Sequence, residues 1–282
     1  MACVIFCAAD FDRLLMPIGA ADYIIAADGG LAHTETLGIR PHAVLGDFDS
    51  LGRIPEGANV FPVEKDDTDA MLAIRHGLER GHKEFLLYGC LEGPRLDHTM
   101  ANFQSLQYLA QRGAHGYLIG KDYIVTVLKD GTLDFPATAT GIFSAFCMGA
   151  DATGVTLTGL KYPLTDGTLS SGFPLGVSNH FTGKQAQITA VGADALVIYD
   201  RENGLPVKDL SLHMVFSGNP GTGKTMLAQS IADALDMPLI IWGIKSTTKA
   251  QDGLYVYDVV QRLYDSQFGG EGVDNIAKYV KL

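Results

Sequence analysis

Short apolar runs alternate with amphipathic segments over the first 120 residues of the chain. The apolar, β-rich runs are at residues 4–8, 23–27, 43–45, 60–63, 84–88 and 116–119. Apolar residues at helical spacing follow at 33–37, 69–80 and 99–111. Glycine follows the first two of these segments, as expected at the carboxyl end of a helix. The alternation predicts a mainly parallel, Rossmann-like sheet covered by helices.

The pattern changes after Lys121. Residues 123–199 show no convincing helical spacing. Their β-rich runs, separated by Thr, Gly, Pro and Asp, are at 124–128, 142–146, 154–158, 187–190 and 196–199. This arrangement is typical of an all-β sandwich of antiparallel strands.

A third type of pattern begins near Pro206. Residues 212–216 predict a strand, and a helix is expected to extend to Leu235. We therefore expect an α/β domain at 1–122, an all-β sandwich domain at 123–206 and a partial C-terminal P-loop α/β segment at 207–282.

Composition excludes several classes of protein. The 282 residues include 32 acidic and 21 basic ones, and a net charge of −11 disfavours unspecific nucleic-acid binding. No apolar stretch reaches the ~18 residues that a membrane helix needs. The four cysteines form no C-x-x-C pair, and aspartates interrupt the apolar N-terminus, so we expect no signal peptide and a reducing cytoplasm.

Aspartates gather where the predicted strands of the first domain end. They are Asp28, Asp47, Asp49, Asp66, Asp67, Asp69 and Asp97. Carboxylates clustered without histidine or cysteine suit a hard cation such as Mg²⁺, which with Lys65 and Arg95 would allow a triphosphate to approach. The alternative is that these residues only form turns, in which aspartate is common.

Two further polar residues stand at the start of the predicted helix that follows Asp97. His98 and Asn102 are four residues apart, where free N–H groups of a helix can bind phosphate. The alternative for His98 is a capping residue or a buried histidine that is hydrogen-bonded in the core.

Six short motifs resemble those of the thiamine pyrophosphokinase family, over residues 1–206. In order they are AADGG at 26–30, GDFDS at 46–50, KDDTD at 65–69, RLDH at 95–98, GLKYPL at 159–164 and GVSNH at 176–180. The resemblance implies an enzyme that transfers the pyrophosphoryl group of ATP to the hydroxyl of thiamine, giving thiamine diphosphate and AMP. It also implies a homodimer in which the second domain of one subunit completes the cleft of the other.

The resemblance implies roles for particular residues. Asp47, Asp49 and Asp69 would hold Mg²⁺ and, with Asp97, form the catalytic group; Asp28, Gly29, Lys65, Thr68, Arg95, His98 and Asn102 would bind the nucleotide and its metal; Ser178 and Asn179 would contact thiamine. Asp69 and Asp97 are both candidates for the general base. Pro94 departs from the family pattern, which has glycine there, and removes an N–H that could contact phosphate.

Residues 218–225 match the P-loop pattern G-x-x-x-x-G-K-[ST] after a predicted strand and before a predicted helix. The defining residues are Gly218, Gly223, Lys224 and Thr225. Residues 207–282 resemble the start of a MoxR-like AAA+ ATPase. No later strand ends in a suitable aspartate, so we expect a truncated or fused segment without ATP hydrolysis of its own. The alternatives for the chain are an AAA+ ATPase with an accessory N-terminal region, or a non-catalytic thiamine or nucleotide sensor.

Overall fold

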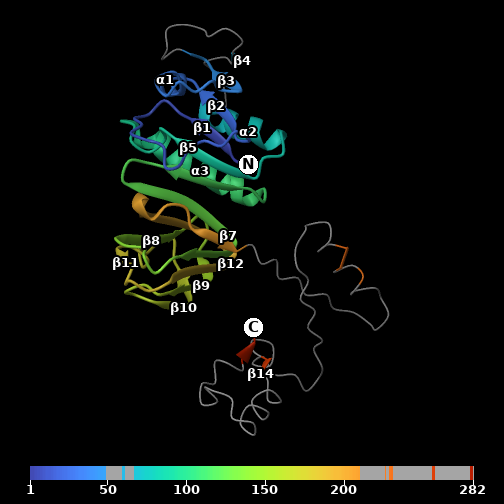
Figure 1. Cartoon of the computed structure of the whole chain (residues 1–282). Coiled ribbons are helices and arrows are strands. Elements are labelled where there is room, and N and C mark those ends of the chain that lie inside the picture. The colour runs from blue at the N-terminus through green and yellow to red at the C-terminus, as the bar shows by residue number, and fades with distance from the viewer. Residues whose placement is uncertain are drawn as a thin grey trace. The chain divides into compact units, whose positions relative to one another are not determined.

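The computed structural model describes residues 1–48, 59–60, 67–209, 226, 229–230, 256–257 and 280–281. The chain divides into two compact units, Met1–Leu212 and His213–Leu282. The first unit contains the described helices and strands of both predicted N-terminal domains (Figure 1).

Six parallel strands form the first part of this unit, as predicted. They are β1 (Cys3–Phe6), β2 (Tyr23–Ala27), β3 (Ala43–Gly46), β4 (Asn59–Val60), β5 (Glu84–Tyr88) and β6 (His115–Ile119). Their order across the sheet is β6-β5-β1-β2-β3-β4. The strand expected at 60–63 is described at Asn59–Val60, and its remainder lies outside the described residues.

Three helices connect these strands: α1 (Gly30–Thr36), α2 (Asp69–Glu79) and α3 (Leu96–Gln111). Ile74 of α2 and Leu109 of α3 pack with Ile5 on one face of the sheet. On the other face, Phe6 and Tyr88 pack against apolar residues of the segment 7–22, which joins β1 to β2. A connecting segment rather than a helix therefore covers part of that face.

The sheet continues into the β-rich part, because β6 pairs antiparallel with β7. The strands of this part are β7 (Tyr123–Phe135), β8 (Ile142–Cys147), β9 (Ala152–Thr158), β10 (Leu164–Leu169), β11 (Asn179–His180), β12 (Ala186–Asp200) and β13 (Val207–Asp209). All of residues 123–199 are described and none is helical, which confirms the strand-rich prediction. The proposed boundary at residue 122 thus separates two parts of one sheet (Figure 1).

Two predicted strand ends in this part are wrong. The runs at 187–190 and 196–199 belong to one strand, β12, with a register shift between Ala190 and Asp194. The strand expected to end at Leu128 continues to Phe135. Polar residues interrupt the apolar pattern at both places, but the pairing of β7 with β12 continues beyond them.

The strands β7 and β12 also organise the core of the β-rich part. Residues 187–189 of β12 pair with β9, whereas residues 195–199 pair with β8. Phe135, Phe143 and Tyr199 pack edge to face inside, with ring centroids 5.0–5.8 Å apart. The fold is therefore α/β with an antiparallel, strand-rich second part.

The C-terminal unit is described at few positions. Met226, Gln229 and Ser230 are helical, and the short strands β14 (Val256–Tyr257) and β15 (Val280–Lys281) pair antiparallel. The strand expected at 212–216 lies outside the described residues. None of the helices in the described part of the chain has the length and apolar character that a membrane span requires.

Candidate functional site

A cleft of about 530 Å³ opens at the carboxyl ends of the parallel strands. Its walls come from the segments that follow β1, β2, β3 and β5 and from the first turns of α2 and α3. This edge of an open parallel sheet is where ligands bind in α/β folds generally. The sequence analysis predicted that the aspartates lie at this edge, where the parallel strands end.

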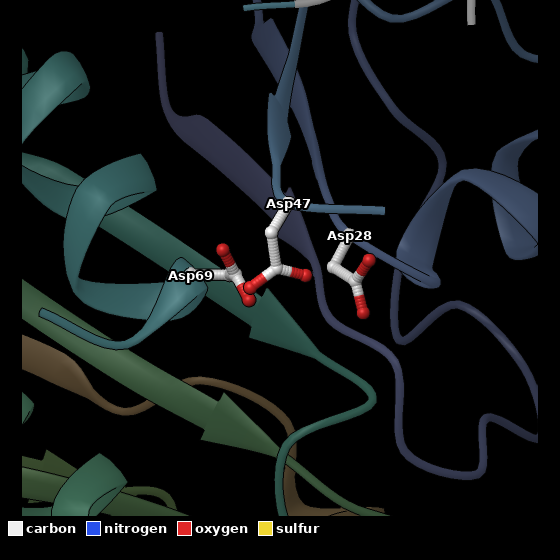
Figure 2. A group of neighbouring side chains, drawn as sticks. All are labelled: Asp28, Asp47 and Asp69. Atoms are coloured by element: carbon white, nitrogen blue, oxygen red, sulfur yellow. The ribbon is translucent and has the colours of Figure 1, made fainter. Parts of the chain in front are cut away.

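Three of those aspartates meet in the cleft. Asp28 follows β2, Asp47 follows β3 and Asp69 begins α2. One carboxylate oxygen of each lies within 4.8 Å of the others, and Figure 2 shows the three side chains as neighbours, with Asp47 between Asp69 and Asp28. Three carboxylates at this spacing form a set of hard oxygen ligands of the kind that Mg²⁺ prefers.

Unusual backbone conformations bring these carboxylates together. Asp28 and Phe48 have positive φ angles of 47° and 59°, which non-glycine residues rarely adopt. Gly46 passes so close to Asp28 that a Cβ atom on it would lie 3.0 Å from the Asp28 Cα. The ring of Phe48 is buried and anchors the turn beside Asp47. The turn is thus specified by a glycine that allows close approach and an aromatic residue that fixes it.

Part of the predicted metal and nucleotide set lies outside the described residues. This applies to Asp49, predicted as a metal ligand, and to Lys65, predicted to contact the nucleotide. Asp28 was expected only near the metal, but its carboxylate belongs to the same group as those of Asp47 and Asp69.

The first turn of α3 forms the opposite wall. Arg95, the N-cap residue, donates from Nε and Nη2 to the two carboxylate oxygens of Asp97 at 3.0 and 2.6 Å. Because these charged hydrogen bonds favour the ionised carboxyl, they lower the pKa of Asp97 to about 2. A carboxylate with so low a pKa is a weak general base near neutral pH. Pro94 leaves the turn intact, and Arg95 and His98 both line the cleft.

Two predicted nucleotide-binding residues also support the cleft walls through local hydrogen bonds. Asn102 is buried, and its Nδ2 donates to the carbonyl of Cys90 at 2.8 Å, which holds the β5–α3 connection. Thr68 caps α2 by accepting a hydrogen bond from the Met71 N–H at 3.2 Å. Gly29 is the N-cap residue of α1. Thr68 and Asn102 line the cleft as well.

Two cysteines in the cleft lining were not assigned to the site from the sequence. Cys7 follows β1 and Cys90 follows β5, and both thiols are buried. Burial raises the pKa of Cys7 to about 12 and that of Cys90 well above its usual value. Both are therefore neutral near pH 7 and give the cleft an uncharged floor. Because both cysteines follow apolar strands of the parallel sheet, their positions in the sequence could have indicated that they line the cleft.

The predicted thiamine residues lie in the β-rich part. Asn179 is buried: its Oδ1 accepts from the Tyr162 N–H at 2.9 Å and its Nδ2 donates to the Tyr162 carbonyl at 2.7 Å. The carboxamide thus joins the motif at 159–164 to the motif at 176–180. Ser178 has a φ of 58°, and its N–H donates to the Ser144 hydroxyl. The described residues that line the aspartate cleft lie between Cys7 and Asn102, so Ser178 and Asn179 are not brought into it within one chain.

The four P-loop residues Gly218, Gly223, Lys224 and Thr225 lie outside the described residues. The P-loop role predicted for these residues therefore stays a prediction.

Family models match three segments of the chain. Residues 17–118 match the thiamin pyrophosphokinase catalytic domain, and residues 132–191 match the thiamin pyrophosphokinase vitamin B1 binding domain. Residues 214–282 match the ATPase family associated with various cellular activities (AAA). A comparison with curated proteins gives no match.

Solved structures of thiamine pyrophosphokinases share the fold. The enzyme from Bacillus subtilis is 25% identical, with a TM-score of 0.60, and the match covers 71% of this chain and 98% of that one. The protein from Geobacillus thermodenitrificans is 26% identical, with a TM-score of 0.58, and the match covers 71% and 97%. That from Candida albicans is 15% identical over 71% and 89%, with a TM-score of 0.55, and shows the fold alone.

Proposed function

The chain belongs to the thiamin pyrophosphokinase family through residues 17–118 and 132–191, and we propose that its aspartate cleft is where pyrophosphoryl transfer takes place. The reaction moves the pyrophosphoryl group of ATP to the hydroxyl of thiamine and leaves AMP. The observation that carries this proposal is the convergence of Asp28, Asp47 and Asp69 in the matched catalytic domain.

The proposed cofactor is Mg²⁺. The three converging carboxylates fit it because they offer oxygen ligands and a combined negative charge. Asp28, Asp47 and Asp69 would hold the ion, with Asp49 as a further candidate. When bound, Mg²⁺ supplies positive charge that offsets the charge of the phosphate oxygens.

The first turn of α3 is the proposed phosphate-binding wall. The early N–H groups of a helix have no partner within the helix, and its dipole favours an anion there. Arg95 adds a positive charge and is held in place by Asp97. In this proposal Asp97 orients Arg95 rather than accepting the proton of the thiamine hydroxyl, because its lowered pKa makes it a weak base.

We propose a homodimer in which each cleft is completed by the β-rich part of the partner. Two observations support it: Ser178 and Asn179 do not reach the cleft of their own chain, and apolar side chains nearby are exposed. Phe173 is 65% exposed and Leu175 52% exposed beside a hollow of about 230 Å³. Light scattering should give about twice the 30.2 kDa mass of one chain.

The proposed location is the cytoplasm. It is supported by Cys3, Cys7, Cys90 and Cys147, all free thiols in the structure. Thiols persist where the environment is reducing.

Product analysis tests the proposed function directly. The full chain is incubated with ATP, thiamine and MgCl₂, and the products are identified by phosphorus NMR. We expect AMP and thiamine diphosphate, both dependent on thiamine. ADP and phosphate formed without thiamine would instead favour an ATPase that acts through the AAA-like segment. Ligand binding without either product would favour a sensor.

A further inference from the structure

Arg201 is buried at the end of β12, far in sequence from the cleft. It is 3% exposed, and its guanidinium donates to two backbone carbonyls, those of Gly120 (2.8 Å) and Arg13. Its own N–H donates to the carbonyl of Asp122 at 2.9 Å. A buried arginine that donates to carbonyls from two separate segments links their positions, because its guanidinium must stay hydrogen-bonded when it is buried.

The Arg13 carbonyl belongs to the segment 7–22, which has no helix or strand. Its residues Ala8 and Ala9 line the cleft. The Ala9 N–H donates to the Gly89 carbonyl at 3.0 Å, and the Ala9 carbonyl lies 2.8 Å from Nε2 of His33. The hydrogen bond from Arg201 holds the same segment farther from the cleft, at Arg13.

This segment also packs against the loop that carries Arg95. A Cβ atom placed on Gly93 would lie 3.3 Å from the Ala9 Cβ, so the Gly93 backbone packs against the Ala9 methyl group. A displacement of Ala9 would therefore move the chain two residues before Arg95.

The turn 120–122, held by Arg201, contacts the same loop at the neighbouring residue, Glu92. Oε1 of Glu92 accepts a hydrogen bond from the Lys121 N–H. Gly120 lies so close to this carboxylate that a Cβ atom there would be 2.6 Å from Oε1. Both segments that Arg201 joins thus contact the loop before Arg95, at Glu92 and Gly93.

We propose that Arg201 is a positioning residue for the nucleotide side of the cleft. It acts from the β-rich part, through the Arg13 and Gly120 carbonyls, on the loop that presents Arg95. The inference rests on the proposed function for the identity of the nucleotide. It assigns to Arg201 an effect on nucleotide affinity rather than on the chemical step.

The test compares R201Q, R201K and the matched control R112Q in the full chain. Arg112 also donates to a backbone carbonyl, that of Tyr108, but lies exposed at the far end of α3. Affinity for a non-hydrolysable ATP analogue with MgCl₂ is measured by calorimetry, KM and kcat are taken from AMP release, and thermal unfolding reports folding.

We expect R201Q to weaken analogue binding and raise the KM for ATP by about tenfold, as when a buried carbonyl loses its donor. The kcat should stay within about twofold, because no contact to the reacting atoms is removed. R201K should restore part of the affinity, and R112Q should match the wild type. Unchanged affinity in a folded R201Q protein would overturn the proposal.

If R201Q does not fold, variants of Glu92 test the same proposal. E92A should weaken analogue binding severalfold and E92Q, which keeps an acceptor, should bind as the wild type does; equal affinity in all three would overturn the proposal. If the wild type binds the analogue but releases no AMP, the proposed function is wrong. The comparison of analogue affinities among the variants would then still test the role of Arg201. A wild type that binds no nucleotide would overturn both.

Discussion

The parallel-sheet part and the β-rich part use their motif residues differently. In the first, Asp28, Asp47 and Asp69 follow strands or begin a helix and line one cleft, with one carboxylate oxygen of each within 4.8 Å of the others. In the second, the Asn179 carboxamide is hydrogen-bonded to the backbone of Tyr162. The motifs of the first part thus bring carboxylates together in a cleft, whereas the Asn179 carboxamide joins two motifs of the second part.

The largest expected effect comes from the first part. Asp69→Asn should lower thiamine-dependent AMP release by roughly 10²–10³-fold, because it removes a charged ligand from the cleft. Thermal unfolding should change little, since Asp69 is not in the buried core. Asp166→Asn, an exposed aspartate of the β-rich part, is the control. If the Asp69 variant kept wild-type activity, the cleft aspartate would matter no more to the reaction than Asp166, which would contradict the proposed site.

The next effect should appear in stability rather than turnover. Asn179→Ala removes the two hydrogen bonds that the buried Asn179 carboxamide makes with the N–H and carbonyl of Tyr162, at a cost of about 1–3 kcal/mol in unfolding free energy. Urea unfolding measures it, and Ser178→Ala, which keeps its backbone hydrogen bond, should cost much less. An Asn179→Ala protein of unchanged stability with a raised KM for thiamine would place Asn179 in the substrate site.

A smaller effect concerns the exposed pair at α3. Arg95→Gln removes the charge that lowers the pKa of Asp97, so this pKa should rise from about 2 toward its ordinary 3.8. In the wild type, the stabilisation from this pair is present above pH ~4 and is lost as the pH falls through 2. Carboxyl NMR titration measures the shift. A pKa that stays near 2 in the variant would mean that another group stabilises the carboxylate.

The smallest effect is expected in the C-terminal unit. Lys224→Ala should leave thiamine-dependent AMP release unchanged within about twofold, because we place the transfer reaction in the aspartate cleft. AMP release by the full-length variant measures this. A tenfold loss would show that the P-loop contributes to the reaction.

The parallel part could be predicted closely because its strands are buried on both faces. Four of the five residues of β5 are buried, so an unbroken apolar run coincides with the strand. The aspartates follow such runs, and parallel strands end at one edge of the sheet, so their convergence could be predicted as well.

The β-rich part could not be predicted as well, since its strands are partly exposed. Most residues of β10 are not buried, and no apolar pattern marks that strand. The strands β7 and β12 pair on both sides of Asp130, where the register shifts and the local sequence resembles a turn. The contacts of Arg201 could not be predicted either, because they join it to Gly120 and Arg13, which are distant in the sequence.

The measurement that most directly tests the aspartate cleft is Mn²⁺ binding, followed by electron paramagnetic resonance of the free ion. The wild type is compared with Asp28→Asn, Asp47→Asn and Asp69→Asn. Asp166→Asn is the matched control, since Asp166 has a φ of 46°, close to the 47° of Asp28, and asparagine tolerates this conformation.

We predict that each of the three cleft variants binds Mn²⁺ at least about tenfold more weakly than the wild type. The Asp166 variant should bind as the wild type does. Equal Mn²⁺ affinity in the wild type and all three cleft variants would contradict the assignment of Asp28, Asp47 and Asp69 as the metal site.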